Sequence, residues 1–332
     1  MPRVSVLLPV RDAVSTLPEC LESLSSQTLA DHEVVAVDDG STDGSGEILD
    51  AAAHRDRRIR VLHTNRCGIA AALNTALAQA RASLVARMDA DDVAHPERLE
   101  LQAERLERDP ATHVLGCRVR LVGGVGNRGM RAYVEWQNRL TEHAAIEREL
   151  WVESPLAHPS VAMRTADLGA LCGYRDFEGP EDYDLWLRAH AAGLRFAKLP
   201  EVLLAWRDSP DRLSRRDPRY GAERFRALKI ESLERGPLRG RAAVIWGAGP
   251  IGKRWARALL GRGHRVEAFV EVSPRRIGKW IHGAPVVDSA AAGRLRGPLH
   301  LAAVGQPGAR ARIREEAVRV GLEDGVDLLA VA

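Results

Sequence analysis

Residues 4–108 alternate four times between short apolar runs and segments with helical spacing. The apolar runs lie at 4–10, 32–40, 59–63 and 83–88, and the helical segments lie at 15–27, 45–55, 68–80 and 95–108. The first run has no polar face, which is typical of a parallel strand covered by helices on both sides. Repeated strand–helix units predict an α/β fold with a mostly parallel sheet flanked by helices.

The alternation is interrupted and then restarts, which indicates a second domain. The chain has 332 residues, more than one typical single-core domain contains. Residues 207–240 are dominated by Arg, Asp and Pro outside one helical segment, and a new strand–turn–helix pattern follows. We therefore predict a first domain over 1–235, a linker over 236–241 and a small α/β domain over 242–332.

Composition limits the classes of protein and compartment. Hydrophobic residues make up 45% of the chain and charged residues 28%, with a net charge of +3. These values are typical of a globular protein, and the mild positive charge is only weak evidence for an anionic partner. The cysteines form no CxxC pair, so we expect a reducing, cytoplasmic setting. No stretch reaches the roughly 18 apolar residues of a membrane span, so any contact with the inner membrane face would be peripheral.

One apolar run ends in three carboxylates. Residues 85–92 read VARMDADD, so Asp89, Asp91 and Asp92 directly follow a buried strand. Two like charges about 5 Å apart repel by about 3 kcal/mol at an effective dielectric of 20. Carboxylates are the hard ligands that Mg²⁺ and Mn²⁺ prefer, and a divalent ion with a diphosphate would turn this repulsion into attraction. A solvated acidic loop before the next helix is the competing interpretation.

A second acidic cluster closes another strand of the same predicted sheet. Residues 37–45 read VDDGSTDGS, in which Asp38 and Asp39 end the strand and a tight turn leads into a helix. Ligands of open α/β sheets bind at the carboxyl ends of the strands, where a carboxylate can accept hydrogen bonds from a base or a ribose. A polar turn with a helix cap would explain the same residues. Two acidic clusters at one edge of the sheet favour a shared site.

A third motif, GPEDYDLWLR at 179–188, places Glu181 and Asp182 at the start of a helix. The helix dipole favours negative charge at this position. A carboxylate held there could act as general base toward an acceptor hydroxyl. Helix capping alone is the alternative interpretation.

These motifs together resemble those of family 2 inverting glycosyltransferases, which have the nucleotide-sugar-binding fold called GT-A. The resemblance covers residues 2–215 and is carried by VSVLLPVRDAVSTLPECLESLSSQTL, VVAVDDGSTDGSGEIL, GIAAALNTALAQARASLVARMDADD and GPEDYDLWLR. It implies a metal-dependent enzyme that moves a hexose or N-acetylhexosamine from a nucleotide sugar to a glycan hydroxyl. One in-line displacement would invert the anomeric centre.

The resemblance also implies roles for particular residues. Asp91 and Asp89 would hold the metal, Mn²⁺ or Mg²⁺, with Asp89 nearer the ribose, and Asp182 would be the catalytic base. The residues expected around the nucleotide sugar are Pro9, Val10, Arg11, Asp39, Gly68, Asn74, Asp89, Glu181, Arg207 and Ser214. Arg11 departs from the family, which usually carries an aromatic residue there. His158 falls where relatives often have a His near the metal, although a packed or surface His is the stronger expectation.

The C-terminal domain contains a glycine pattern with two interpretations. Gly247, Gly249 and Gly252 form GxGxxG between a strand and a helix, and Glu271 ends the next strand. This is the context in which a Rossmann-like domain binds NAD(P), with the acidic residue on the ribose. However, no residue set for hydride transfer follows, and the same glycines allow close strand–helix packing. We expect packing to be the stronger explanation.

The order of the two domains is similar to that of a smaller group, the β-1,3-N-acetylglucosaminyltransferase-like proteins linked to galactosylation of queuosine in tRNA. VLGCRVR, IWGAGPIGKRW and VEAFVEV carry this similarity. It implies UDP-galactose or UDP-N-acetylglucosamine as donor and introduces tRNA as an alternative acceptor.

The acceptor and the reaction class leave alternatives. The basic stretch 207–241 could contact tRNA phosphates, although its acidic residues favour a solvated linker. The leading hypothesis is a glycan or lipid-linked glycan acceptor. A nucleotide-sugar-binding or dinucleotide-binding protein without turnover is the alternative of another class.

Overall fold

The computed structural model describes residues 1–124, 128–209 and 212–332. The chain divides into two compact units, the first formed by 1–147 and 155–220 and the second by 148–154 and 221–332. The domain bounds expected from the sequence, 1–235 and 242–332, stay a prediction, because compactness alone does not show which segment folds independently. Among the described residues, the structure has no helix both long and apolar enough to cross a bilayer.

The first unit contains an eight-stranded sheet in the order β3-β2-β1-β4-β7-β6-β8-β5. Its strands are β1 (Val4–Val10), β2 (His32–Asp39), β3 (Ile59–Thr64), β4 (Leu84–Arg87), β5 (Val93–Ala94), β6 (Val114–Gly123), β7 (Ala162–Arg164) and β8 (Phe196–Asp208). The first four strands are mutually parallel, as are β6 and β8, whereas β7 runs antiparallel to both β4 and β6. The expected α/β class with a mostly parallel sheet is confirmed.

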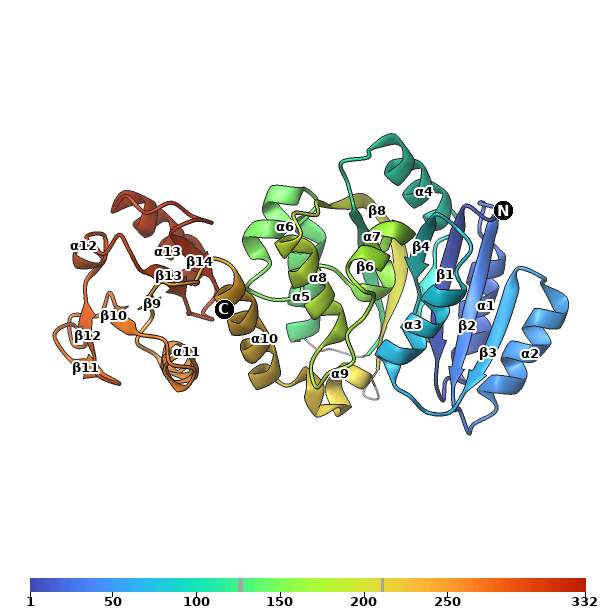
Figure 1. Ribbon diagram of the computed structural model, residues 1–332, viewed down its shortest axis with the longest axis horizontal. Helices are drawn as coiled ribbons and strands as arrows, with labels where there is room; N and C mark the ends of the chain where they lie inside the picture. The colour runs from blue at the N-terminus through green and yellow to red at the C-terminus, as the bar shows by residue number, and fades with distance from the viewer. Residues whose placement is uncertain (125–127, 210–211) are drawn as a thin grey trace. The chain divides into compact units, whose positions relative to one another are not determined.

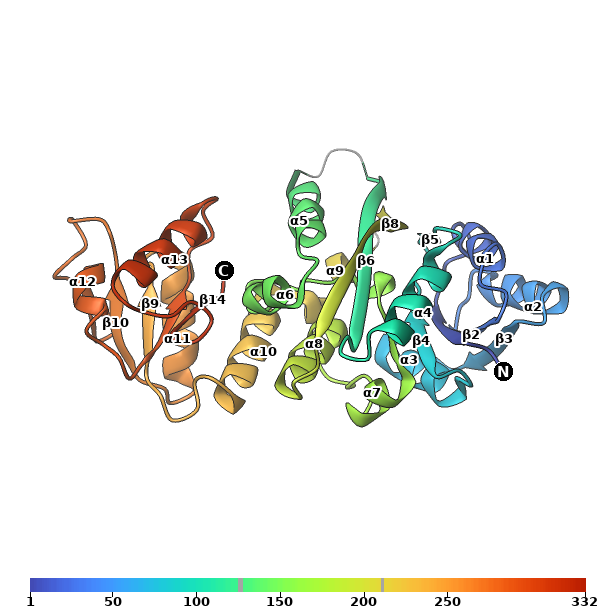
Figure 2. The ribbon, with the colours of Figure 1, turned by 90° about the horizontal axis from the view of Figure 1, so that it is seen from above.

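Helices cover both faces of this sheet, and α1 and α3 lie on opposite sides of the first strands (Figures 1 and 2). The helices that begin in the first unit are α1 (Leu17–Ser25), α2 (Ser45–Arg55), α3 (Ile69–Gln79), α4 (Arg98–Arg108), α5 (Arg128–Arg139), α6 (His143–Glu149), α7 (Thr165–Ala170), α8 (Glu181–Ala191) and α9 (Leu213–Arg216). Short 3₁₀ turns occur at η1 (His158–Ser160) and η2 (Pro218–Tyr220). Because both faces are covered, every residue of β2 is buried, which explains the uninterrupted apolar run at 34–37.

The strand order places a topological switch point between β1 and β4. From β1 the chain moves outward to β2 and β3 and then crosses back to β4 on the other side of β1. Such a reversal opens a crevice at the carboxyl ends of the two central strands. Both acidic clusters of the sequence follow strands that end at this edge.

Strand β8 joins two short apolar runs of the sequence. The two short apolar runs at 195–199 and 202–206 form one strand, and its pairing with β6 shifts register between Cys117 and Val119. The shift leaves Pro200 and Glu201, which separate the two runs, without partners in β6. The strand carries Arg207 and Asp208 at its end.

The second unit contains a six-stranded sheet in the order β11-β12-β10-β9-β13-β14. Its strands are β9 (Ala243–Trp246), β10 (Val266–Val270), β11 (Trp280–Ile281), β12 (Ala284–Val287), β13 (Leu299–Ala302) and β14 (Leu328–Ala330). Its helices are α10 (Ala222–Arg235), α11 (Pro250–Gly261), α12 (Ser289–Ala292) and α13 (Ala309–Arg319). Five neighbouring strands of this sheet are mutually parallel, in the order β12-β10-β9-β13-β14. This is the strand order of a Rossmann-type half, with β9 at the centre.

Candidate active site

The carboxyl ends of β1, β2 and β4 meet at one edge of the first sheet. Val10, the last residue of β1, pairs with Asp38 of β2, and Leu7 pairs with Arg87 of β4. Beyond β4, the backbone N–H of Met88 still donates to the Leu7 carbonyl oxygen at 3.1 Å. The turn 89–92 therefore leaves the sheet directly beside the end of β1.

Asp89, Asp91 and Asp92 form a compact acidic cluster in this turn. One carboxylate oxygen from each lies within 4.8 Å of the others. Asp92 is almost fully buried, and among the described residues its Oδ2 has no hydrogen-bond partner. Three converging carboxylates with one orphaned buried oxygen are a donor set that fits a hard divalent cation.

The cluster perturbs the protonation of its own members. Burial, and then the charge of Asp89, raise the pKa of Asp91 to about 6. Burial, with the charges of Asp89 and Asp91, raises the pKa of Asp92 well above its usual range. Without a cation, the folded state therefore holds these charges at a cost in free energy.

Arginines surround the acidic cluster, and the sequence reasoning missed two of them. The buried guanidinium of Arg87 forms an ion pair with Asp89. Arg212 stacks on the ring of Trp206, with 4.2 Å between the guanidinium carbon and the ring centroid, and its charge lowers the pKa of Asp91. Arg87 carries no sequence signal because it occupies an ordinary strand position, whereas Arg212 lies between Arg207 and Ser214, which the family resemblance did indicate.

Arg207 contacts the turn itself. Its backbone N–H donates to Asp92 Oδ1 at 2.7 Å, its Nε donates to the Asp91 carbonyl oxygen at 2.7 Å, and its guanidinium pairs with Glu19 of α1. This residue therefore holds the acidic turn against β8 and α1. Ser214 lies exposed in α9, and residues 210–211 of the same segment lie outside the described residues.

Asp39 is engaged with the loop that leads into α3. Its carboxylate accepts the backbone N–H groups of Cys67 at 2.5 Å and of Gly68 at 3.0 Å, and Gly68 has a φ of +89°. Arg11, which follows Pro9 and Val10 of β1, donates to the Asp39 carbonyl oxygen at 3.2 Å. The expected nucleoside residues at the ends of β1 and β2 are thus brought together with Gly68.

Asn74 has a structural contact. Its side-chain amide donates to the Tyr174 carbonyl oxygen at 2.7 Å, and its Oδ1 accepts the Tyr174 N–H at 2.9 Å. These bonds tie α3 to the loop before α8. The predicted place of Asn74 beside the nucleotide stays a prediction, and the two hydrogen bonds show that its amide also positions this loop.

Glu181 and His158 form a buried pair behind the start of α8. His158 Nδ1 lies 3.6 Å from a Glu181 oxygen, and the hydroxyl of Tyr220 donates to the other oxygen at 2.6 Å. Burial would raise the pKa of Glu181, but the hydrogen bonds from His158 and Tyr220 outweigh it and lower that pKa. Burial and the charge of Arg87 lower the pKa of His158. His158 is thus buried and hydrogen-bonded, and because the charge of Asp89 also acts on it, a place near the metal stays a prediction.

Asp182 lies in the first turn of α8 and is less buried than its neighbour Glu181. Its Oδ1 accepts the N–H of Tyr183 at 2.7 Å, one of the free N–H groups at the start of the helix. A carboxylate in this position is stabilised in its ionised form by the helix dipole.

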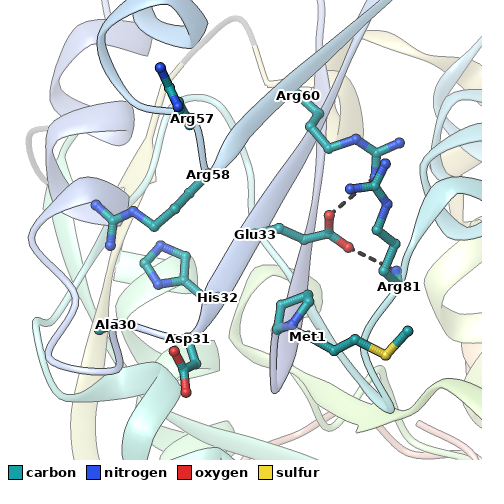
Figure 3. A pocket seen from close by; sticks show the side chains of 10 residues that line it. Met1, Ala30, Asp31, His32, Glu33, Arg57, Arg58, Arg60 and Arg81 are labelled. Carbon is teal, nitrogen blue, oxygen red and sulfur yellow. Dashed lines mark hydrogen bonds and ion pairs between the residues drawn. The ribbon is translucent and has the colours of Figure 1, made fainter.

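A cavity of about 320 Å³ lies at the opposite edge of the sheet, near the amino ends of β1, β2 and β3. Figure 3 shows Glu33 reaching toward Arg60 and Arg81 in this cavity. The Glu33 carboxylate accepts bonds from Ser5, from the Arg81 backbone N–H and from Arg60 at 2.7, 2.8 and 3.1 Å. This cavity is therefore separate from the acidic turn, and its central acid is already neutralised.

In the second unit, the GxGxxG turn is closely packed. A Cβ on Gly252 would lie 1.9 Å from the Gly247 carbonyl oxygen, and one on Gly247 would lie 2.4 Å from a methyl group of Val304. A Cβ on Gly249 would meet nothing within 4 Å. The Glu271 carboxylate accepts the N–H of the next residue and pairs with Arg276. Packing accounts for two of the glycines, and dinucleotide binding stays a prediction.

Comparisons with known proteins identify the family of the chain. The model of the family described as "Glycosyl transferase family 2" matches residues 5–169. The chain is 33% identical over 228 residues to the glycosyltransferase EpsE of Bacillus subtilis, covering 67% of this chain and 79% of that protein. It is 29% identical over 220 residues to the Escherichia coli UDP-Gal:α-D-GlcNAc-diphosphoundecaprenol β-1,3-galactosyltransferase, covering 65% and 78% of the two chains.

The fold also matches that of a solved structure. Staphylococcus aureus TarS, residues 1–349 in complex with UDP-GlcNAc, superposes with a TM-score of 0.56 at 21% identity. The match covers 70% of this chain and 67% of TarS. The chain belongs to glycosyl transferase family 2 and is a nucleotide-sugar-dependent glycosyltransferase.

Proposed function

We propose that the chain is a metal-dependent, inverting glycosyltransferase that moves a hexose or N-acetylhexosamine from a UDP-sugar to a hydroxyl group of a glycan. The acidic cluster at the switch point between β1 and β4 is the observation that carries this proposal. Asp91 and Asp89 are the ligands we assign to Mn²⁺ or Mg²⁺. The bound ion would neutralise charge on the departing nucleoside diphosphate.

The nucleoside half of the donor is assigned to the ends of β1 and β2. Pro9 and Val10 form one wall, and Asp39 holds the Gly68 loop through its backbone N–H groups. The position of Arg11 over the Asp39 carbonyl oxygen offers a planar cation where the family usually has an aromatic ring. A guanidinium plane can stack on a base in place of that ring.

Asp182 is the catalytic base in this proposal. It accepts the proton of the acceptor hydroxyl as the oxygen attacks the anomeric carbon and the bond to the diphosphate breaks. A single displacement of this kind inverts the anomeric centre. Asp182 lies at the start of the helix, where negative charge is favoured, and buried Glu181 beside it positions the first turn of α8 through His158 and Tyr220.

For the acceptor, we favour a glycan or a lipid-linked glycan, because the Escherichia coli relative is named for a diphosphoundecaprenol-linked acceptor. The alternative acceptor is queuosine in tRNA. Part of the basic stretch that could contact tRNA is neutralised within itself, since Arg215, Arg219 and Arg235 pair with Asp208, Asp217 and Glu231. This neutralisation counts against the tRNA alternative.

A nucleotide-release assay tests the proposal. The wild-type chain with Mn²⁺ is expected to release UDP from UDP-galactose or UDP-N-acetylglucosamine, and EDTA is expected to stop the release. Asp91→Asn and Asp182→Asn should each lower turnover by a factor of about 10² or more. Asp31→Asn, an exposed acid at the opposite edge of the sheet, is the matched control and should keep wild-type turnover.

Three results would contradict the proposal or parts of it. Undiminished release by Asp91→Asn would remove the metal assignment, and undiminished transfer by Asp182→Asn would remove the base. Thermal stabilisation by UDP-sugars with no release under any condition would favour a binding protein without turnover. Salt-sensitive retention of tRNA, with sugar transfer to it, would favour the alternative acceptor.

A further inference from the structure

An ordered hairpin projects from the sheet of the second unit. It connects the parallel strands β10 and β12, a link that is usually made by a helix. β11 pairs antiparallel with β12, and the turn between them has positive φ at both His282 (48°) and Gly283 (80°), as a two-residue hairpin turn requires. Gly278 N–H and the Lys279 carbonyl oxygen both bond to Val286. These bonds fix the backbone of the segment 272–282, which we call the 272–282 hairpin.

The hairpin exposes large apolar side chains. Val272 is 85% exposed and Trp280 is 71% exposed, and Ile277 is also exposed. Trp ordinarily buries most of its surface in a core or at an interface. A hairpin whose backbone is ordered while its Trp stays in water indicates that the side chain serves a surface contact.

The same hairpin carries only positive charge. Its sequence VSPRRIGKWIH contains Arg275, Arg276, Lys279 and His282 and no acidic residue. Arg276 pairs with Glu271 at 2.9 Å. Within the described part of the chain, the exposed side chains of Arg275 and Lys279 have no ion pair. The apolar groups are thus mixed with cations that are available to an anionic partner.

We propose that the 272–282 hairpin is a docking surface for an anionic lipid bilayer. An indole ring prefers the level of the lipid headgroups, where its apolar body is covered and its N–H stays hydrated. Val272 and Ile277 would enter the acyl boundary, while Arg275 and Lys279 contact headgroup phosphates. Nucleic acid fits less well, because its phosphates and base faces leave two aliphatic side chains uncovered and the hairpin offers a single aromatic ring.

The 272–282 hairpin belongs to the second unit, and its binding to a bilayer does not depend on the donor, metal or base assigned to the first unit. It would bring the enzyme to a membrane through one rigid hairpin. Binding of this type combines apolar and electrostatic contributions, so it should require negatively charged lipid and should weaken as salt screens the charges.

Vesicle flotation with the full chain tests the inference. The wild-type chain is expected to float with vesicles of phosphatidylcholine and phosphatidylglycerol at low salt and to stay behind with phosphatidylcholine alone. Arg275→Gln combined with Lys279→Gln should weaken partitioning by about 30-fold. Trp280→Ala should weaken it while leaving all charges in place. Arg312→Gln and Val326→Ser, which change a cation and an apolar residue exposed elsewhere in the unit, are the controls and should float like wild type.

The outcomes separate the alternatives. All changed side chains are exposed, so the thermal midpoints of the variants should equal that of wild type. Wild-type protein that does not bind anionic vesicles, or hairpin variants that bind as strongly as the controls, would overturn the inference. Retention on tRNA that the double variant loses, without vesicle binding, would also overturn it and assign the surface to nucleic acid.

Discussion

Replacing Asp91 by Asn should stabilise the protein in the absence of metal, although it removes a residue we assign to catalysis. The pKa of Asp91 rises from its ordinary value of 3.8 to about 6, first because of burial and then because of Asp89. At pH 7 this difference corresponds to about 3 kcal/mol of destabilisation by the ionised carboxylate. Asn has nearly the same shape without the charge, and allowing for desolvation of its amide leaves a gain of about 2 kcal/mol.

The assay is thermal unfolding of the full chain in EDTA and, separately, in saturating Mn²⁺ with UDP. For a unit of this size, about 2 kcal/mol should raise the midpoint of Asp91→Asn in EDTA by about 4–8 °C. Ligand at about 100 times its Kd stabilises the wild-type chain by about 2.7 kcal/mol, and the variant should lose most of that gain. The order of the two midpoints should therefore reverse when metal and nucleotide are added.

The pH dependence gives the same reasoning a second check. Between pH 3.8 and about 6 the folded state binds more protons at Asp91 than the unfolded state does, so this contribution to stability falls as pH rises. Asp91→Asn should flatten that part of the profile, whereas Asp31→Asn should leave it unchanged. A variant that melts at or below the wild-type midpoint in EDTA, with an unchanged pH slope, would refute the electrostatic account of the cluster.

Three further substitutions test local structure. Gly252→Ala places a Cβ 1.9 Å from a carbonyl oxygen and should destabilise the second unit by about 2 kcal/mol or more, measured as an earlier unfolding transition with UDP binding retained. Asn74→Ala removes two hydrogen bonds to the neighbouring loop and should lower the free energy of unfolding by about 1–3 kcal/mol in urea titrations. Hydrogen bonds to Asp50 and Asp38 raise the pKa of His63. The protonated imidazole therefore stabilises the folded state at low pH, and this contribution is lost as pH rises through the raised pKa. His63→Gln should abolish this pH-dependent part of the free energy of unfolding.

The first sheet and the meeting of the acidic clusters were predictable because they follow from short-range pattern and strand direction. Uninterrupted apolar runs such as 4–10 specify strands covered on both faces, and parallel strands bring their carboxyl ends to one edge. The clusters after β2 and β4 had to arrive on the same side for that reason. The antiparallel strand β7 was not predictable, because three residues carry too little pattern to set their pairing.

The partners of individual side chains were not predictable from the sequence. The place of Arg207 near the diphosphate stays a prediction, and no pattern indicated that its guanidinium contacts the backbone at Asp91 and the carboxylate of Glu19, which lies 188 positions away in the chain. The amide of Asn74 likewise bonds to Tyr174 across two elements. Spacing along the chain determines which sheet edge a residue reaches, whereas its rotamer and partners depend on packing that only the folded structure specifies.

The contacts around the acidic turn separate the roles of its three carboxylates. Asp89 is paired with the buried guanidinium of Arg87, and one oxygen of Asp92 accepts the backbone N–H of Arg207. Among the described residues, Asp91 has no ion pair of its own, and it retains a raised pKa despite the nearby charge of Arg212. Asp91 is also less buried than Asp92 and is therefore more accessible to a cation, so we expect Asp91 to make the strongest metal contact and Asp89 a weaker one. The orphaned oxygen of Asp92 is then the third ligand position, and Asp92→Asn should weaken Mn²⁺ binding less than Asp91→Asn does.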